Sequence, residues 1–160
     1  MGGVNGAEAL KAPYALQEKD LEIDRLRAEA ESLPEELVAL QGQVETLEER
    51  LTNLLERRAE LEREYNRHSL DIEDLSAKEK QAEEEQKRAQ SAREQTQYEN
   101  RIQQIKDRIR ELLELSTPIM EAMENLEAEI AQVEEELAAL RPRLQELLEA
   151  NRARVAELEA

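Results

Sequence analysis

The sequence contains no cysteine, no tryptophan and no phenylalanine, and aromatic residues make up 2% of its 160 residues. Without cysteine, the chain can form neither a disulfide nor a thiolate metal site. It also lacks the large aromatic side chains that supply much of the buried area in a globular core. No apolar run approaches the roughly 20 residues that a membrane-spanning helix needs, and residues 1–6 do not resemble a signal peptide. We therefore expect an elongated cytoplasmic protein without membrane association.

Charge is abundant and predominantly acidic. Charged residues make up 38% of the chain, and the formal net charge is −17. Such a chain is expected to repel nucleic acid and anionic membranes over most of its length. Residues 78–111 have a net charge of +1, whereas residues 112–160 have a net charge of −8. The near-neutral segment is either a surface for an acidic or nucleic-acid partner or simply a soluble turn.

Apolar residues recur at alternating spacings of three and four along both halves of the chain. This heptad pattern predicts two long helices, each with one apolar stripe that packs against a partner stripe and supercoils with it. We call these positions the seam. In the first half, the seam comprises Ile23, Leu26, Ala30, Leu33, Leu37, Leu40, Val44, Leu47, Leu51, Leu54, Arg58, Leu61, Tyr65, His68, Ile72 and Leu75. In the second half, it comprises Tyr98, Ile102, Ile105, Ile109, Leu112, Ser116, Ile119, Met123, Leu126, Ile130, Val133, Leu137, Leu140, Leu144 and Leu147.

The seam becomes polar between the two halves, where its positions would be Glu79, Ala82, Gln86, Ala89 and Gln95. Polar residues there weaken helix pairing, which favours a turn near residues 90–97. Folding the chain at this point also places the polar segment 66–69 opposite residues 116–118. We therefore predict an all-α fold, a long kinked antiparallel coiled-coil hairpin. The alternative is one very long helix that forms a parallel dimeric structural coiled coil.

Four residues are predicted to bend or interrupt the helices. Pro34 follows Ser32, a residue type that caps helices, so a break is expected near residues 32–34. Pro118 and Pro142 lack the amide N–H of a helix interior and are expected to kink the second helix. His68 is the sole histidine and lies on the seam, where it has either a structural role at a kink or, less simply, the role of a pH-sensitive joint.

The predicted layout has four parts: a flexible N-terminus at residues 1–6, a first arm at 7–89, the turn at 90–97 and a second arm at 98–160. Kinks are expected within the arms at the residues named above. The first arm is longer than the second, so its apolar residues near the N-terminus lack a partner and mark an interface. The pattern also continues to residue 160 without a stop signal, as expected for a fragment. Candidate contacts with a protein partner or a second copy are Leu10, Tyr14, Leu21, Arg88, Arg93, Tyr98 and Arg101.

No sequence pattern indicates catalysis. The chain has no glycine-rich phosphate loop, nucleophile elbow, HExxH motif or calcium loop. Its neighbouring carboxylates belong to the solvated faces of helices, because a catalytic pair needs a desolvated pocket that a two-helix rod does not provide. A metal site needs three or four convergent ligands, and His68 has no second histidine or cysteine to join it. We therefore expect no enzymatic activity and no cofactor.

Several segments resemble a bacterial family that combines an N-terminal coiled-coil hairpin with a C-terminal four-cysteine zinc ribbon. The similar segments are Leu16–Leu26 with Leu33-Pro34, then Tyr98, Ile102–Ile105, Ile109–Leu112 and Pro118–Glu127, which together span most of the chain. The family's turn usually carries Asn with Lys, Pro or Gly, and here residues 93–97 replace it. The resemblance implies that a zinc ribbon follows residue 160 and that zinc would bind there. Some members of the family serve flagellar assembly, support an alternative sigma factor or bind messenger RNA.

These observations predict a non-enzymatic interaction module, the arm of a zinc-ribbon regulatory or adaptor protein. The alternative is nucleic-acid binding through the hairpin tip or the ribbon, although the chain itself is too acidic to bind nucleic acid appreciably at physiological salt.

Overall fold

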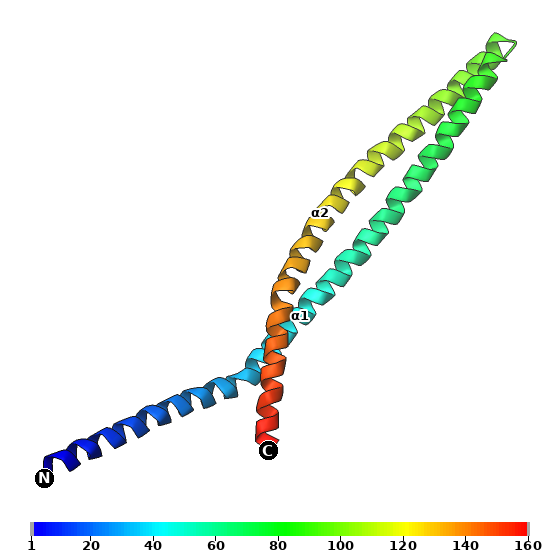
Figure 1. Ribbon diagram of the computed structural model, residues 1–160. Coiled ribbons are helices and arrows are strands. Elements are labelled where there is room, and N and C mark those ends of the chain that lie inside the picture. The colour runs from blue at the N-terminus through cyan, green and yellow to red at the C-terminus, as the bar shows by residue number, and fades with distance from the viewer. Residues whose placement is uncertain (1, 160) are drawn as a thin grey trace. The chain divides into compact units, whose positions relative to one another are not determined.

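The protein is all-α and consists of two helices, as the computed structural model in Figure 1 shows. Helix α1 spans Gly2–Lys87 and helix α2 spans Ala92–Glu159. The structure describes the backbone of residues 2–159 and the side chains of residues 17–29 and 31–159. Within residues 2–159 there is no strand. The single long helix that the parallel-dimer alternative requires is therefore wrong for this chain, because residues 88–91 separate two helices.

The chain divides into two compact units. Unit 2 comprises residues 49–134 and contains the end of α1, the connection and the first part of α2. Unit 1 comprises residues 1–48 together with residues 135–160. In each unit, segments far apart in the sequence pack against each other, which is the arrangement of a helical hairpin.

In unit 2, α1 and α2 run antiparallel on either side of the connection (Figure 1). Every buried residue of this unit lies at a predicted seam position: Leu61, Ala82, Ile102, Leu112, Ser116, Ile119, Ile130 and Val133. The helices form because the sequence between the seam residues is rich in Glu, Gln, Arg and Lys, which are good helix formers. They pair because burying a Leu or Ile side chain stabilises the fold by about 1.5–3 kcal/mol.

Unit 1 follows the same rule over a shorter stretch. Leu37 and Val44 of α1 and Leu137 and Leu147 of α2 are buried, and Leu137 has no exposed surface. Arg143 Nη2 lies 3.9 Å from Glu36 Oε2, and Arg141 Nη2 lies 3.5 Å from Glu48 Oε1, so ion pairs accompany the apolar contact on its outer side. The paired part of α1 therefore includes residues from Glu36 onward.

The prolines do not interrupt the helices, although a break was expected near residues 32–34. Both helices continue through Pro34, Pro118 and Pro142, and Figure 1 shows α1 changing direction where its colour passes from blue to cyan. The hydroxyls expected to cap a new helix instead donate to carbonyls of the preceding turn. Ser32 Oγ lies 2.8 Å from Glu29 O, Ser116 Oγ lies 2.8 Å from Leu112 O, and Thr117 Oγ1 lies 3.2 Å from Leu113 O. Such back-bonding is compatible with a continuous helix that bends.

The helix boundaries also differ from the predicted ones. Helix α1 begins at Gly2, within the segment 1–6 for which the composition predicts flexibility. The connection occupies residues 88–91 instead of 90–97, so α2 already includes residues 92–97. The polar seam positions that suggested a longer turn are accommodated in the helices because they lie close to solvent at the tip.

Candidate interaction surfaces

Hydrogen bonds at residues 85–95 explain where the chain turns. Helix α1 ends with two backbone hydrogen bonds between residues three apart, from Arg88 N to Glu85 O at 3.0 Å and from Ala89 N to Gln86 O at 3.1 Å. Helix α2 begins with a cap: Glu94 N donates to Ser91 Oγ at 3.1 Å, and Gln90 N donates to Glu94 Oε2 at 3.3 Å. This is close to the capping box, in which Ser and a Glu three residues later satisfy free amides at a helix start.

The connection is also tied to the opposite helix. Gln86 Nε2 donates to Gln95 O at 3.2 Å, which links the last turn of α1 to the first turn of α2. The Gln86 side chain at one of these seam positions therefore bonds to the backbone at the other rather than packing in a core. The Ser91–Glu94 spacing is visible in the sequence and would have located the start of α2, but the predicted turn did not use it.

Of the predicted contact residues at the tip, Arg101 lies beside the one aromatic side chain, Tyr98. Tyr98 is half-buried and borders a hollow of about 420 Å³ together with Glu94, Gln97 and Arg101. The negative charge of Glu85 raises the pKa of the Tyr98 phenol, and partial burial and a hydrogen bond to Glu85 act in the same direction. Arg101 opposes this effect. Arg88, Arg93 and Arg101 are exposed, and so are Glu83, Glu94 and Glu99, so the tip carries charges of both signs at its surface.

The apolar residues that precede the paired part of α1 are exposed. Leu21 is 63% exposed, and the seam residues Ile23 and Leu26 are 46% and 52% exposed. At the other end of the chain, Leu158 is 73% exposed. The prediction that Leu21 lacks an intrachain partner therefore agrees with its exposure, whereas the side chains of Leu10 and Tyr14 lie outside the described residues.

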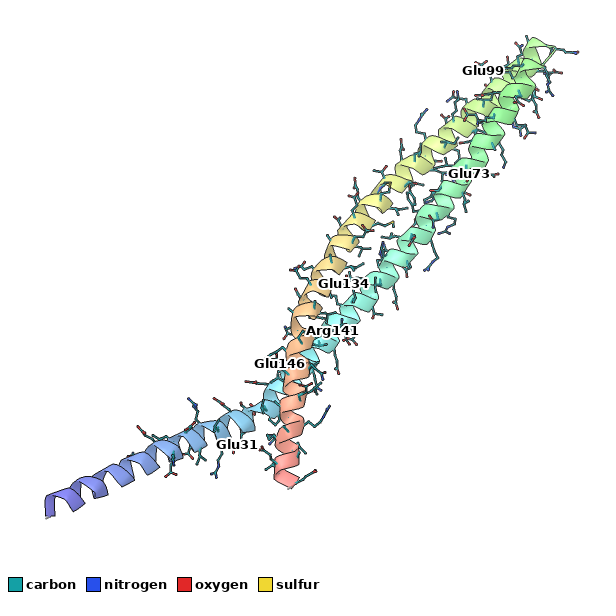
Figure 2. The ribbon with its side chains drawn as sticks, in the orientation of Figure 1. Glu31, Glu73, Glu99, Glu134, Arg141 and Glu146 are labelled. Carbon is teal, nitrogen blue, oxygen red and sulfur yellow. The ribbon has the colours of Figure 1, made fainter. Side chains whose placement is uncertain are left out.

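Ion pairs on the outer faces of unit 2 connect the two helices. Arg58 Nη2 lies 3.0 Å from Glu127 Oε1, and Lys106 Nζ lies 3.8 Å from Glu79 Oε1. The residue numbers of each pair add to 185, so both pairs report one antiparallel register. Figure 2 shows charged side chains, Glu73 and Glu99 among them, projecting from both helices of this unit. These faces are solvated, as the sequence predicted for the carboxylates.

Where the seam of unit 2 is polar, a large residue of α1 lies at the same level as a small residue of α2. His68 and Ser116 have numbers that add to 184, so the register places them at the same level of unit 2. The His68 side chain is 18% exposed, and its Nε2 lies 3.9 Å from Glu64 Oε1 on the same helix. Ser116 is 6% exposed. A small residue at position 116 therefore leaves room at the level of the imidazole, which supports a structural role for His68.

Close to the level of His68 and Ser116 lies an apolar surface that was not among the contact surfaces predicted from the sequence. Tyr65 of α1 and Met120, Met123, Glu124 and Glu127 of α2 line a hollow of about 240 Å³, which we call the methionine hollow. Met120 is 48% exposed. Methionine side chains beside Pro118 either fill a packing gap or line a groove for a partner, and Met120 lies at the surface. Met120 directly follows the seam residue Ile119, so the sequence places it beside the seam, and this position could have indicated its exposure.

Two kinds of site were sought among the described side chains. No group of three or more His, Asp or Glu residues is placed to hold a metal ion in residues 17–29 and 31–159. Over the same part of the chain, neither helix carries a stretch long and apolar enough to cross a membrane.

Comparisons of the chain with protein-family models, with curated proteins and with solved structures find no match. The fold and its surfaces define the class of protein on their own: an all-α helical hairpin whose apolar residues pack between two antiparallel helices and whose outer faces are charged.

Proposed function

We propose that this protein is a non-enzymatic coiled-coil scaffold whose outer faces bind other macromolecules. The observation that carries the proposal is that some large apolar residues remain exposed although the two helices pair. Most of those of the seam pack between α1 and α2, whereas the seam residues Ile23 and Leu26 are about half exposed, and Leu21, Leu70 and Leu113 are 63%, 65% and 53% exposed. A chain that pairs its two helices and still exposes large apolar residues in several places is suited to bind proteins along its length.

The coiled-coil form of the hairpin is part of this proposal. The heptad spacing favours it, because a strict seven-residue repeat keeps the seam facing its partner only if the helices supercoil. Spin labels at Arg57 and Glu129, exposed residues at the same level of unit 2, would measure the pairing in solution. Axes of packed helices are 8–10 Å apart, so a separation above about 30 Å would contradict the paired arrangement.

The resemblance to the zinc-ribbon family extends the proposal to the arm of an adaptor or regulatory protein. Nucleic-acid binding through the tip is the rival function. The exposed Arg88, Arg93 and Arg101 favour it, but the carboxylate of Glu85 beside Tyr98 opposes it, because a base that stacks on this ring would bring its phosphates close to that charge. We therefore place protein binding first.

The proposal can be tested by placing a photo-crosslinking amino acid at one position at a time in the full chain inside its host cell. We expect Leu21, Leu70 or Leu113 variants to form a reproducible adduct with a protein. The same probe at Leu137, which has no exposed surface, is the matched control and should form none. A chain that crosslinks to no macromolecule from any exposed position would refute the scaffold function, and adducts with RNA alone would favour the rival.

A further inference from the structure

The methionine hollow lies on unit 2 between side chains of α1 and α2. It is lined by one side chain of α1 and four of α2, and it adjoins the level at which the small Ser116 replaces an apolar seam residue. An enclosed apolar cavity of about 150 Å³ can hold a benzene molecule, so an open hollow of about 240 Å³ has room for a large apolar side chain. Methionine side chains are flexible and polarisable, which lets them adapt to an incoming group.

The hollow continues into a longer apolar face on α2. Leu113 is 53% exposed, and Met120 follows it by seven residues, with 48% exposure. Residues seven apart lie within about 20° of each other around a helix and about 10 Å apart along it. This spacing is that of the i and i+7 anchors of a helix lying in a groove.

The charge around this face has one sign. Residues 111–134 contain seven Glu and no Lys or Arg. Glu127, which lines the hollow, already binds Arg58 of α1 at 3.0 Å. Glu124, which also lines the hollow, forms no ion pair among the described side chains. Carboxylates that lack cations beside an exposed apolar surface complement a partner that carries Lys or Arg beside apolar residues.

We infer that the methionine hollow and the Leu113–Met120 face bind a basic amphipathic helix of a partner protein. The inference rests on the proposed scaffold function and names the partner's chemistry. A large apolar side chain of that helix enters the hollow, a second one covers Leu113, and Lys or Arg residues on either side reach Glu124 and Glu121. A helix suits the site better than an extended strand, because α1 and α2 offer no sheet edge whose backbone groups a strand could bond.

The test uses a synthetic amphipathic helix of Leu, Ala and Lys with one Trp on its apolar face. Because the chain has no Trp, a blue shift of the fluorescence reports burial of the peptide's own ring. We expect saturable binding that weakens as salt rises, because exposed charges are screened. Met120→Glu should weaken binding by about tenfold, since a charge replaces an apolar wall. Glu124→Gln should weaken it by about threefold, as expected for one exposed ion pair.

Matched controls separate the site from general acidity. Leu115→Ser alters an equally exposed Leu that lies about 200° away from Leu113 around α2, and it should leave affinity within about twofold. A peptide with Glu in place of every Lys should not bind. Met120→Ala, with unchanged circular dichroism, serves as the milder variant if Met120→Glu perturbs folding.

Each remaining outcome is decisive. Absence of binding, or binding that ignores both Met120 variants, overturns the inference. A chain that is dimeric on its own, and that Met120→Glu makes monomeric, shows that a second copy covers the hollow instead. These failures leave the scaffold function intact if photo-crosslinks still form at Leu21 or Leu70, whereas loss of all crosslinks refutes both.

Discussion

Arg58 and Glu127 join the two helices of unit 2 through a contact of 3.0 Å between Nη2 and Oε1. Arg58 occupies a seam position between Leu54 and Leu61, where the spacing would call for an apolar residue. Its Nε is buried without a hydrogen-bond partner, and the two side chains remain 42% and 53% exposed. An ion pair this exposed contributes about 0–1 kcal/mol, so we attribute to it the register of the helices rather than their stability.

Arg58→Leu should therefore stabilise the fold. A leucine continues the seam and removes the buried Nε, and Glu127 is exposed enough to be solvated on its own. We expect the free energy of unfolding to rise by about 1 kcal/mol, the burial of a Leu less the lost ion pair. Urea unfolding followed by circular dichroism measures it. Arg57→Leu, a change at the exposed neighbouring residue, should give no gain. A loss of stability in Arg58→Leu would mean that the ion pair itself holds the helices together.

Leu112 and Leu113 are adjacent in sequence and opposite in burial, with 1% and 53% of their surface exposed. Leu112→Ala removes buried methyl groups and should lower the free energy of unfolding by about 2–4 kcal/mol. Leu113→Ala should lower it by less than about 1 kcal/mol, because its side chain is half in water already. Thermal or urea unfolding compares the two. Equal losses would show that the seam assigned from the spacing is not the packed face of α2.

The buried positions of both units could be predicted from the sequence, whereas the ends of the helices could not. Leu37, Leu61, Leu112 and Leu137 are buried because a spacing of three and four aligns them on one face, which needs no knowledge of the partner helix. The position of the connection depends on hydrogen bonds of single side chains, such as the one between Ser91 and Glu94. The polar seam positions between the two halves indicate only the general region of the turn. Pro34 misleads because it removes one N–H without ending a long helix.

The methionine hollow shows a second limit of sequence reasoning. It combines Tyr65 with Met120 and Met123, residues of different helices that meet only once the register is known. The predicted turn already placed residues 66–69 opposite residues 116–118, and the ion pair of Glu79 with Lys106 agrees with that register. The hollow itself depends on how the side chains at this level pack, which periodicity does not predict. The exposure of Arg88, Arg93 and Arg101 was easier to anticipate, because these residues lie near a turn.

Gly42 lies inside α1, and a Cβ added to it would meet no other atom within 4 Å. Glycine costs a helix interior about 0.8–1 kcal/mol relative to alanine, because its backbone loses more freedom on folding. Gly42→Ala should therefore raise the free energy of unfolding by about 0.5–1 kcal/mol. Ala39→Gly, at an exposed position one turn earlier in the same helix, should lower it by a similar amount. If both changes are neutral, this part of α1 is not helical in solution.

Glu85 raises the pKa of Tyr98, so Glu85→Gln should lower that pKa towards the ordinary tyrosine value of about 10. The midpoint of phenolate absorbance against pH, in a chain with Tyr14→Phe and Tyr65→Phe, measures it. A pKa raised by folding means that the tyrosine's stabilising contribution is complete below its unfolded pKa and declines as pH rises through the folded one.

Arg101→Gln should shift the midpoint upward, because the arginine lowers the pKa at present. Glu83→Gln, an exposed change in the same helix, is the control and should leave the midpoint unchanged. If Glu85→Gln also leaves it unchanged while the helices persist, α1 and α2 do not meet at the tip in solution.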